Sequence, residues 1–181
     1  MKTSHFLLAA TLMLASCTAS QKNAAPQPSV STDTATVYFT QEISPASLVR
    51  IYEALQVPAT GRVAVKISTG ESGGHHYLQP RLIQQLVNTV NGTIVECNTA
   101  YGGSRAGTEK HWQTIREHGF LDIAKVDIMD EEGDFCIPVV DSTWIKYDRV
   151  GTHMQNYDFM INLAHFKGHA MGGFGGVLKS R

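Results

Sequence analysis

The 181-residue chain is poor in charge of either sign and in cysteine, and it lacks the short motifs that mark several large classes of enzyme. Its 15 basic and 16 acidic residues give a formal net charge of −1, and without a long basic run or a basic–aromatic stripe nothing indicates a nucleic-acid partner. A nucleophile elbow, a metalloprotease helix, a paired-cysteine motif and the full phosphate-loop pattern are all missing. Length and a 43% hydrophobic content fit one globular domain whose chemistry stays open.

The N-terminus has no apolar run long enough to span a bilayer, but it has the features of a bacterial lipoprotein leader. Lys2 supplies positive charge, residues 6–15 are apolar, and the sequence LASC ending at Cys17 resembles the lipobox at which such a leader is cleaved. We expect a signal peptide over residues 1–16 and a diacylglyceryl group on the Cys17 thiol, anchoring the chain to a membrane of the bacterial cell envelope. An ordinary secretory leader with an incidental cysteine is the alternative.

A polar linker follows this cysteine. Residues 18–35 are mainly Ser, Thr, Ala, Gln and Pro and offer almost nothing to bury, which is typical of a flexible tether. Residues 17–35 are therefore expected to be the lipidated cysteine with its tether, and residues 36–181 the folded domain.

Two further cysteines lie in the expected domain. An oxidising envelope would permit a disulfide between Cys97 and Cys136. Two buried thiols are slightly favoured, because Cys97 lies in an apolar strand pattern, where cysteine behaves as a small hydrophobe.

The apolar pattern predicts strands alternating with helices of about ten residues, which is typical of a parallel sheet covered on both faces. We expect a three-layer α/β domain with helices on both faces and right-handed crossovers. Serine and proline signals mark helix starts, and Gly119 marks a helix end. The predicted strands are 36–40, 62–68, 93–98, 124–129 and 157–166, the predicted helices begin at Pro45, Pro80 and Thr108, and a β excursion or hairpin is expected within 135–150.

Ligands of open parallel sheets bind beyond the carboxyl ends of the strands, and polar, glycine-rich loops follow the predicted strands there. Glycines let backbone amides approach an anion closely. Four loops should meet at this edge: STGESGGHHY (68–77), TAYGGSR (99–105), DEEGD (130–134) and KGHAMGGFGG (167–176).

Lys66 and Glu96 interrupt otherwise apolar strands. An unpaired carboxylate within a sheet would be costly, so Glu96 is expected to pair with Lys66 or with Arg105. A structural ion pair and a functional group delivered to the edge of the cleft are equally compatible with the pattern.

The segment after the last predicted strand carries the best cluster of candidate ligands. His165, Lys167 and His169 alternate at a spacing of two, so they share one side of an extended chain. With Lys179 and the glycine amides behind them, they favour an anion such as phosphate or carboxylate. A metal site using His165 and His169 is the weaker alternative, since further ligands are not assured. The glycines assigned to this candidate site are Gly172, Gly173, Gly175 and Gly176.

The other histidines receive a structural interpretation. His75 and His76 are adjacent in a loop, so they point apart and are expected to be exposed. His111 and His118 are expected on the surface of the third helix or at its cap.

Four long segments of the chain resemble the domain of unknown function 362 family, some members of which are labelled iron–sulfur centre proteins. The resemblance covers about residues 36–181 and implies little function, because the family is largely uncharacterised. Such members usually continue past the glycine-rich loop, whereas this chain ends at Arg181, so a truncated domain is one expectation. Iron–sulfur members carry a ferredoxin-type cysteine run that is missing here, so no cluster is predicted. The segments are GRVAVKISTGESGGHHYLQPRLI, NGTIVECNTAYGGSRAGTEKHW, HGFLDIAKVDIMDEEGD and YDFMINLAHFKGHAMGGFGGVLK.

These observations favour a lipid-anchored envelope protein whose α/β domain binds a small anionic ligand or cofactor of unknown identity. An envelope enzyme acting on a small organic acid or phosphate compound is one alternative, with Lys66 or His165 as acid–base and Arg105 holding a carboxylate. A truncated, non-catalytic fragment of an iron–sulfur centre-type protein is the other.

Overall fold

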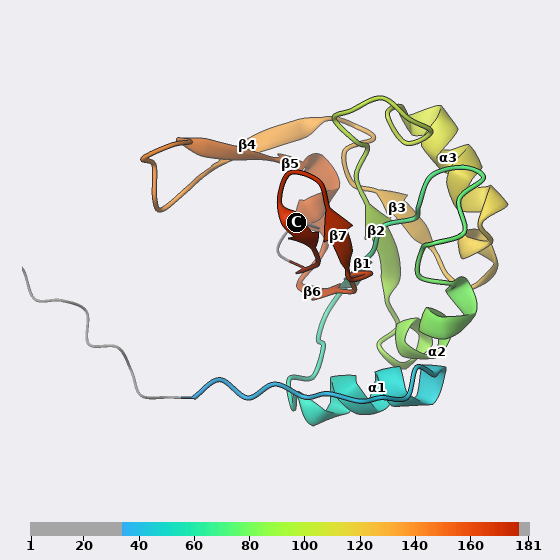
Figure 1. Cartoon of the computed structure of the whole chain (residues 1–181). Helices are drawn as coiled ribbons and strands as arrows, with labels where there is room; N and C mark the ends of the chain where they lie inside the picture. Colours follow the sequence, from blue (N-terminus) through green and yellow to red (C-terminus); the bar gives the residue numbers. More distant parts are fainter. Residues whose placement is uncertain (1–33, 178–181) are drawn as a thin grey trace, which may run out of the picture. The chain divides into compact units, whose positions relative to one another are not determined.

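A computed structural model of the chain describes residues 34–177 (Figure 1). The described residues from Val37 onward belong to one compact unit, and the description below concerns that unit. The predicted leader, Cys17, nearly all of the tether and Lys179 lie outside the described residues. None of the helices within 34–177 has the length and apolar character needed to cross a membrane.

A four-stranded parallel sheet forms the centre of this unit, with strand order β3-β2-β1-β6. Val65 of β1 is in register with Ile94 of β2 and with Ile161 of β6, and Ile94 is in register with Val126 of β3. Each strand is short, and because all four are parallel their carboxyl ends lie at the same edge of the sheet. The strands are β1 (Val63–Lys66), β2 (Thr93–Glu96), β3 (Val126–Ile128) and β6 (Phe159–Asn162).

Three α-helices precede or connect these strands. A capping box starts α1 (Pro45–Ala54), in which Ser44 Oγ accepts from the Ser47 amide at 3.1 Å and Pro45 occupies the first turn. α2 (Pro80–Thr89) links β1 to β2 and packs against α1, and α3 (Thr108–Glu117) links β2 to β3. Gly119, with φ of 77°, ends α3 in the left-handed conformation, as the sequence predicts.

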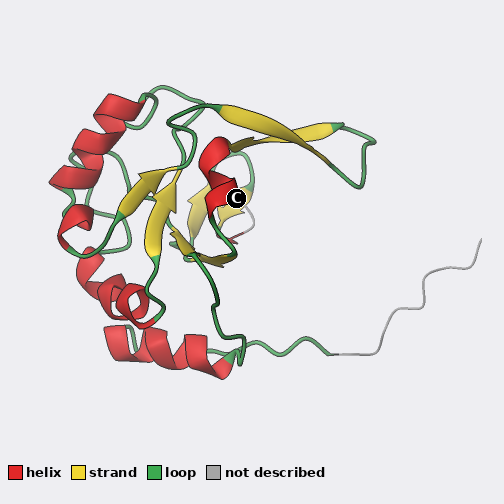
Figure 2. Ribbon diagram, turned by 180° about the vertical axis from the view of Figure 1, so that it is seen from behind, coloured by secondary structure: helices red, strands yellow, loops and turns green. Residues whose placement is uncertain are grey.

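The main core lies between the sheet and the helices α2 and α3. Its fully buried members include Val65 and Ile94 from the sheet, Ile83 from α2 and Ile115 from α3, with Phe120 of the 3₁₀ helix η1 (Phe120–Asp122) beside them. Burying each such side chain contributes about 1.5–3 kcal/mol. Both views show the two helices on this one side of the sheet (Figure 2).

The opposite face of the sheet carries a smaller apolar cluster and the 3₁₀ helix η2 (Thr152–Asn156). Asp127 of β3 accepts hydrogen bonds from His153 Nδ1 at 2.7 Å and from the Tyr157 hydroxyl at 2.6 Å, which fastens η2 to this face. The predicted α/β class with a parallel sheet is confirmed. The cover is uneven, however, since the α-helices of the described region pack on one face and a 3₁₀ helix on the other.

Two antiparallel hairpins complete the described fold. β4 (Asp134–Pro138) pairs with β5 (Tyr147–Gly151), as expected for residues 135–150. β7 (Lys167–His169) pairs with β8 (Gly173–Gly175) in the segment that follows the sheet.

Two strand predictions need correction. Residues 36–40 form no strand, because no neighbouring strand pairs with them and their apolar members Val37 and Phe39 are exposed. The last central strand covers Phe159–Asn162 and not 157–166. Its apolar run continues because Leu163 still packs against the main core after the chain has left the sheet.

The two cysteines of the domain are free thiols. Cys97 is half-buried, and burial raises its pKa to about 11, so the thiol is protonated and a poor nucleophile at neutral pH. Cys136 on β4 is exposed, so the expectation that both thiols are buried is wrong for this residue.

The join between β5 and η2 gives a test of the packing. A Cβ at Gly151 would lie 2.4 Å from the backbone carbonyl of Met129, so Gly151→Ala should destabilise the fold by about 3 kcal/mol through overpacking. The matched control is Gly168→Ala in β7, where an added Cβ meets nothing within 4 Å. Thermal unfolding measures both, and equal melting temperatures for the two variants would contradict the described packing.

Candidate functional site

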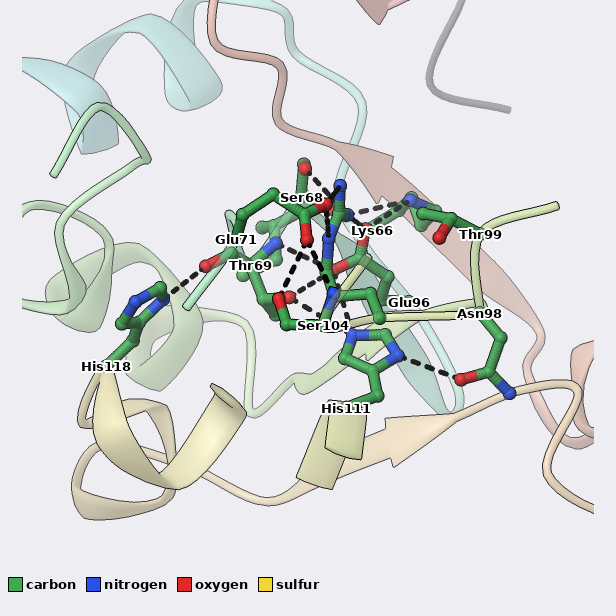
Figure 3. A network of polar contacts seen from close by, with 12 residues as sticks. Lys66, Ser68, Thr69, Glu71, Glu96, Asn98, Thr99, Ser104, His111 and His118 are labelled. Carbon is green, nitrogen blue, oxygen red and sulfur yellow. Dashed lines mark hydrogen bonds and ion pairs between the residues drawn. The ribbon is translucent and has the colours of Figure 1, made fainter. Parts of the chain in front are cut away.

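A buried carboxylate organises the polar groups at the carboxyl ends of β1 and β2 (Figure 3). Glu96 is only 4% exposed. Its Oε2 accepts from both the amide and the hydroxyl of Thr69 at 2.6 Å, and its Oε1 accepts from Arg105 Nη1 at 2.8 Å. Lys66 Nζ lies farther away, 4.0 Å from Oε1. Of the two partners that the sequence suggests, Arg105 therefore forms the close ion pair.

Arg105 joins the loop after β1 to the loop after β2. Its Nε and Nη2 donate to Glu71 Oε1 at 2.9 and 2.8 Å, and its Nη1 also donates to Ser68 Oγ at 3.1 Å. Glu71 Oε2 in turn accepts from the amide and the hydroxyl of Ser104. Since four of the five guanidinium hydrogens are directed at protein oxygens, Arg105 acts mainly as a cross-link between loops.

His111 reaches this network from α3 and has no exposed surface. Its Nε2 lies 3.1 Å from Thr69 Oγ1, and its Nδ1 lies 3.1 Å from Asn98 Oδ1. The side-chain nitrogen of Asn98 donates to Thr108 Oγ1, which leaves Oδ1 facing the ring of His111. The prediction that His111 lies on the helix surface is wrong, because the buried hydroxyl and amide face the ring from inside the fold.

The order Thr69, His111, Asn98 resembles a nucleophile, a base and an orienting group. Thr69 is completely buried, however, and its hydroxyl already donates to Glu96. In this conformation a substrate has no access to that oxygen, so the three residues support the site and do not react in it.

His118 holds the same loop from a second side. Its Nδ1 donates to the Thr69 carbonyl at 2.7 Å, and its ring stacks on Tyr77 with centroids 4.0 Å apart. His111 within α3 and His118 at its carboxyl end thus both contact Thr69 in the loop after β1. The neighbouring His75 and His76 are exposed, as expected.

Burial and charge oppose each other at this edge. Burial alone would raise the pKa of Glu96, but the His111 hydrogen bond and the charges of Lys66 and Arg105 outweigh it and hold this pKa below its usual range. Burial lowers the pKa of Lys66, and the nearby Glu96 charge only partly reverses that effect. The charged form of Lys66 is therefore destabilised, since its interactions do not fully offset the cost of burying the charge.

Lys66 and its neighbour on β6, Asn162, both have unused hydrogen-bonding capacity. Lys66 Nζ donates to the Ile67 carbonyl at 2.8 Å, and no second hydrogen bond of this amine occurs within residues 34–177. Asn162 stands in register with Lys66, and its Oδ1 is buried without a partner among the described residues. A small group that accepts from Lys66 and donates to Asn162 would satisfy both. Sequence reasoning missed Asn162, whose only signal was its position at the end of an apolar strand.

The segment 165–176 forms its own hairpin. His165 and Lys167 are exposed, and His169 Nδ1 accepts from the Gly172 amide at 3.0 Å, which closes the turn. Gly172 and Gly173 are exposed, whereas Gly175 and Gly176 are buried. Within the described residues, no hydrogen bond or ion pair links the His165, Lys167 or His169 side chain to Glu96 or its partners.

Metal binding finds no ready-made site in this part of the chain. No group of three or more His, Cys, Asp or Glu side chains in residues 34–177 is placed to hold a metal ion. His169 has its Nδ1 engaged by Gly172, so only its Nε2 could serve the metal site considered for His165 and His169.

A separate cavity of about 560 Å³ lies at the opposite, amino-terminal edge of the sheet. Arg62 and Lys125 line it, but Arg62 is already paired with Asp158. The cavity also faces the carboxyl end of α2 around Asn88 and Asn91, and the negative end of the helix dipole there disfavours anions. It therefore does not compete with the Lys66 edge as an anion site.

The profile of a family described as a domain of unknown function, DUF362, matches residues 63–180. The chain belongs to this family. No curated protein and no solved structure matches the chain. The DUF362 match begins at the first residue of β1 and contains Lys66, Glu96, Arg105 and Asn162, whereas α1 precedes it. The polar edge thus lies within the DUF362 domain itself.

The buried carboxylate gives a test of this network. Glu96→Gln should cost about 3 kcal/mol or more of unfolding free energy, because it leaves Arg105 and Lys66 without their buried counter-charge. Glu109→Gln on the exposed side of α3 is the control and should change stability by less than about 0.5 kcal/mol. Chemical denaturation of both variants measures the difference.

The same variants predict a pH dependence. The folded-state pKa of Glu96 is lowered, so its contribution to stability is present above its ordinary pKa of 4.5 and is lost as the pH falls through the lowered value. Glu96→Gln should therefore show a smaller loss of stability in acid than the parent chain. Parallel acid profiles would rule out Glu96 as an ionised, paired group.

Proposed function

We propose that this DUF362 protein is a lipid-anchored protein of the bacterial cell envelope whose α/β domain binds a small anionic ligand at the carboxyl edge of its sheet. The observation that carries the proposal is Lys66, an ammonium group nine-tenths buried with a single hydrogen bond. Such a group is costly to bury, and an anion that accepts its remaining hydrogens would lower that cost.

The surrounding residues divide into positioning groups and candidate contacts. Glu96 and Glu71 neutralise Arg105, so this arginine positions the loops and contributes little free charge to a ligand. Lys66 and Asn162 are the candidate contacts, because each has unused hydrogen-bonding capacity. An anion that also carries a hydroxyl or a protonated oxygen, such as a hydroxy acid or a phosphate monoester, satisfies both side chains.

The glycine-rich hairpin is a second candidate contact for the ligand. Lys167 is an exposed cation, and His169 closes the adjoining turn. Replacing both Lys167 and His169 with alanine separates the role of the hairpin from that of Lys66, since among residues 34–177 no hydrogen bond or ion pair joins the Lys167 or His169 side chain to Lys66.

Lys66→Met tests the anion site, because methionine keeps the packing of the alkyl chain and removes the charge. Inorganic phosphate and acetate serve as probes, with calorimetry as the measurement and sodium chloride holding the ionic strength constant. Binding should weaken about tenfold or more, since a hydrogen bond to a charged group contributes about 1.5–3 kcal/mol. In the parent chain, binding should weaken as the pH rises through the lowered pKa of Lys66.

The control for this variant is Lys125→Met, which removes an exposed lysine at the other edge of the sheet. It should bind the probes as the parent chain does. An equal loss of affinity in the two variants would show that only the net charge of the protein matters. Unchanged binding in Lys66→Met would show that Lys66 does not contact the anion.

An envelope enzyme acting on a small organic acid or phosphate compound is the second candidate function. The lowered pKa of Lys66 favours it, because an amine that loses its proton at a lower pH is a better general base. Chemical conversion of an added hydroxy acid, and not binding alone, would distinguish the enzyme from a binding protein.

The lipid anchor is proposed from the LASC sequence ending at Cys17. In a bacterial host, Cys17→Ala should abolish incorporation of labelled fatty acid and leave the leader uncleaved at this position, because the thiol is the acceptor. Mass spectrometry of the N-terminal peptide makes the measurement. Cys136→Ala removes an exposed thiol elsewhere and should still be acylated, whereas acylation of Cys17→Ala would exclude the proposed anchor.

A further inference from the structure

The hairpin of β4 and β5 ends in an apolar tip. Figure 1 and Figure 2 both show this hairpin extending away from the four-stranded sheet. Val140, Trp144, Ile145 and Tyr147 lie at or beside the turn, with relative exposures of 106%, 92%, 57% and 59%. A water-exposed turn normally carries polar residues, so a cluster of this kind indicates a surface that binds something.

The charges of the hairpin are concentrated away from the turn. Residues 139–146 contain only Asp141 and Lys146 as charged side chains, and these cancel. At the base of the hairpin, Arg149 forms a two-pronged ion pair with Asp134, with both oxygens 2.7 Å from Nη2. The hairpin therefore has a hydrated base and a nearly neutral, aromatic end.

The turn also satisfies part of its own backbone. The Val139 amide donates to the Lys146 carbonyl at 3.3 Å, and the Thr143 amide donates to Asp141 Oδ1 at 3.0 Å. This lowers the cost of moving the turn out of water, because unpaired backbone groups are expensive in an apolar medium.

We infer that this tip, residues 139–147, inserts into the headgroup region of the membrane that carries the lipid anchor. Tryptophan and tyrosine prefer this region because their rings are apolar and carry one polar group each, and Lys146 suits anionic headgroups. The inference rests on the proposed anchor at Cys17. About 20 residues separate that cysteine from Val37, and the polar composition of this segment predicts a chain that spans about 25 Å on average. The tether would therefore hold the tip close to the surface at a high effective concentration.

Tryptophan fluorescence can test this directly, since the chain contains only Trp112 and Trp144. The acylated mature protein carrying Trp112→Phe, reconstituted in vesicles of phosphatidylethanolamine and phosphatidylglycerol, reports on Trp144 alone. In vesicles, the emission of Trp144 should lie at shorter wavelength than that of an indole exposed to water. When the lipids carry brominated acyl chains, its intensity should also fall, because bromine quenches tryptophan fluorescence. The reciprocal variant, Trp144→Phe, reports on Trp112, which is hydrogen-bonded to Glu131 and packs on the core, and it should show neither effect.

A second pair of variants tests the apolar contact. Ile145→Ser should reduce the quenching of Trp144, whereas Val57→Ser, at a residue of similar exposure, should leave it unchanged. Unquenched, unshifted Trp144 in vesicles would overturn the inference and direct attention to a protein partner for the tip. Mass spectrometry of Cys17 is independent of this readout. If Cys17 is acylated but Trp144 is not quenched, the proposed anchor stands and the insertion of the tip is wrong. If Cys17 is not acylated, the proposed anchor is wrong.

Discussion

The ionised Glu96 side chain, buried at the end of a central strand, is the constraint on which the site depends. A carboxylate in this position must be compensated by charge and by hydrogen bonds, or the sheet edge would not be stable. Thr69, Arg105 and His111 supply that compensation from the loop after β1, the loop after β2 and α3. One charged group therefore fixes three separate segments of chain, which is why the loops at this edge have a defined geometry.

The same compensation is unequal between the two cations. Arg105 directs four hydrogens at protein oxygens, whereas Lys66 Nζ forms one hydrogen bond and stays 4.0 Å from the carboxylate. The reason lies in the alternation of the strand, since Lys66 leaves the sheet on the face opposite to Glu96 and reaches it only around the strand end. The arginine is thus used in holding the fold, and the lysine retains capacity for a ligand.

The sequence predicts the meeting of Lys66, Glu96 and Arg105 because the carboxyl ends of parallel strands gather at one edge whatever the details of packing. It does not predict the burial of His111, since a spacing of seven from His118 places two residues on one helix face without saying which face meets the sheet. Asn162 was missed for a related reason. Its place beside Lys66 depends on the register of β1 and β6, which are neighbours in the sheet but far apart in the sequence. The hairpin at 165–176 was expected as a binding loop, and its turn is closed by His169 itself, a local contact that residue spacing does not reveal.

The hairpin tip proposed to enter the membrane and the sheet edge proposed to bind a ligand are connected through β3. The loop after β3 leads directly into β4, and Asp130 in that loop accepts from the Asn98 amide at 2.9 Å, beside the buried His111. The base of the β4–β5 hairpin is therefore fastened to the same edge of the sheet that carries Lys66. A tip held in the headgroup region would restrict how far this edge can turn from the membrane surface. A ligand present in the envelope would then bind to the site close to the membrane surface. Anionic headgroups at that surface would compete with free anions for binding to Lys66.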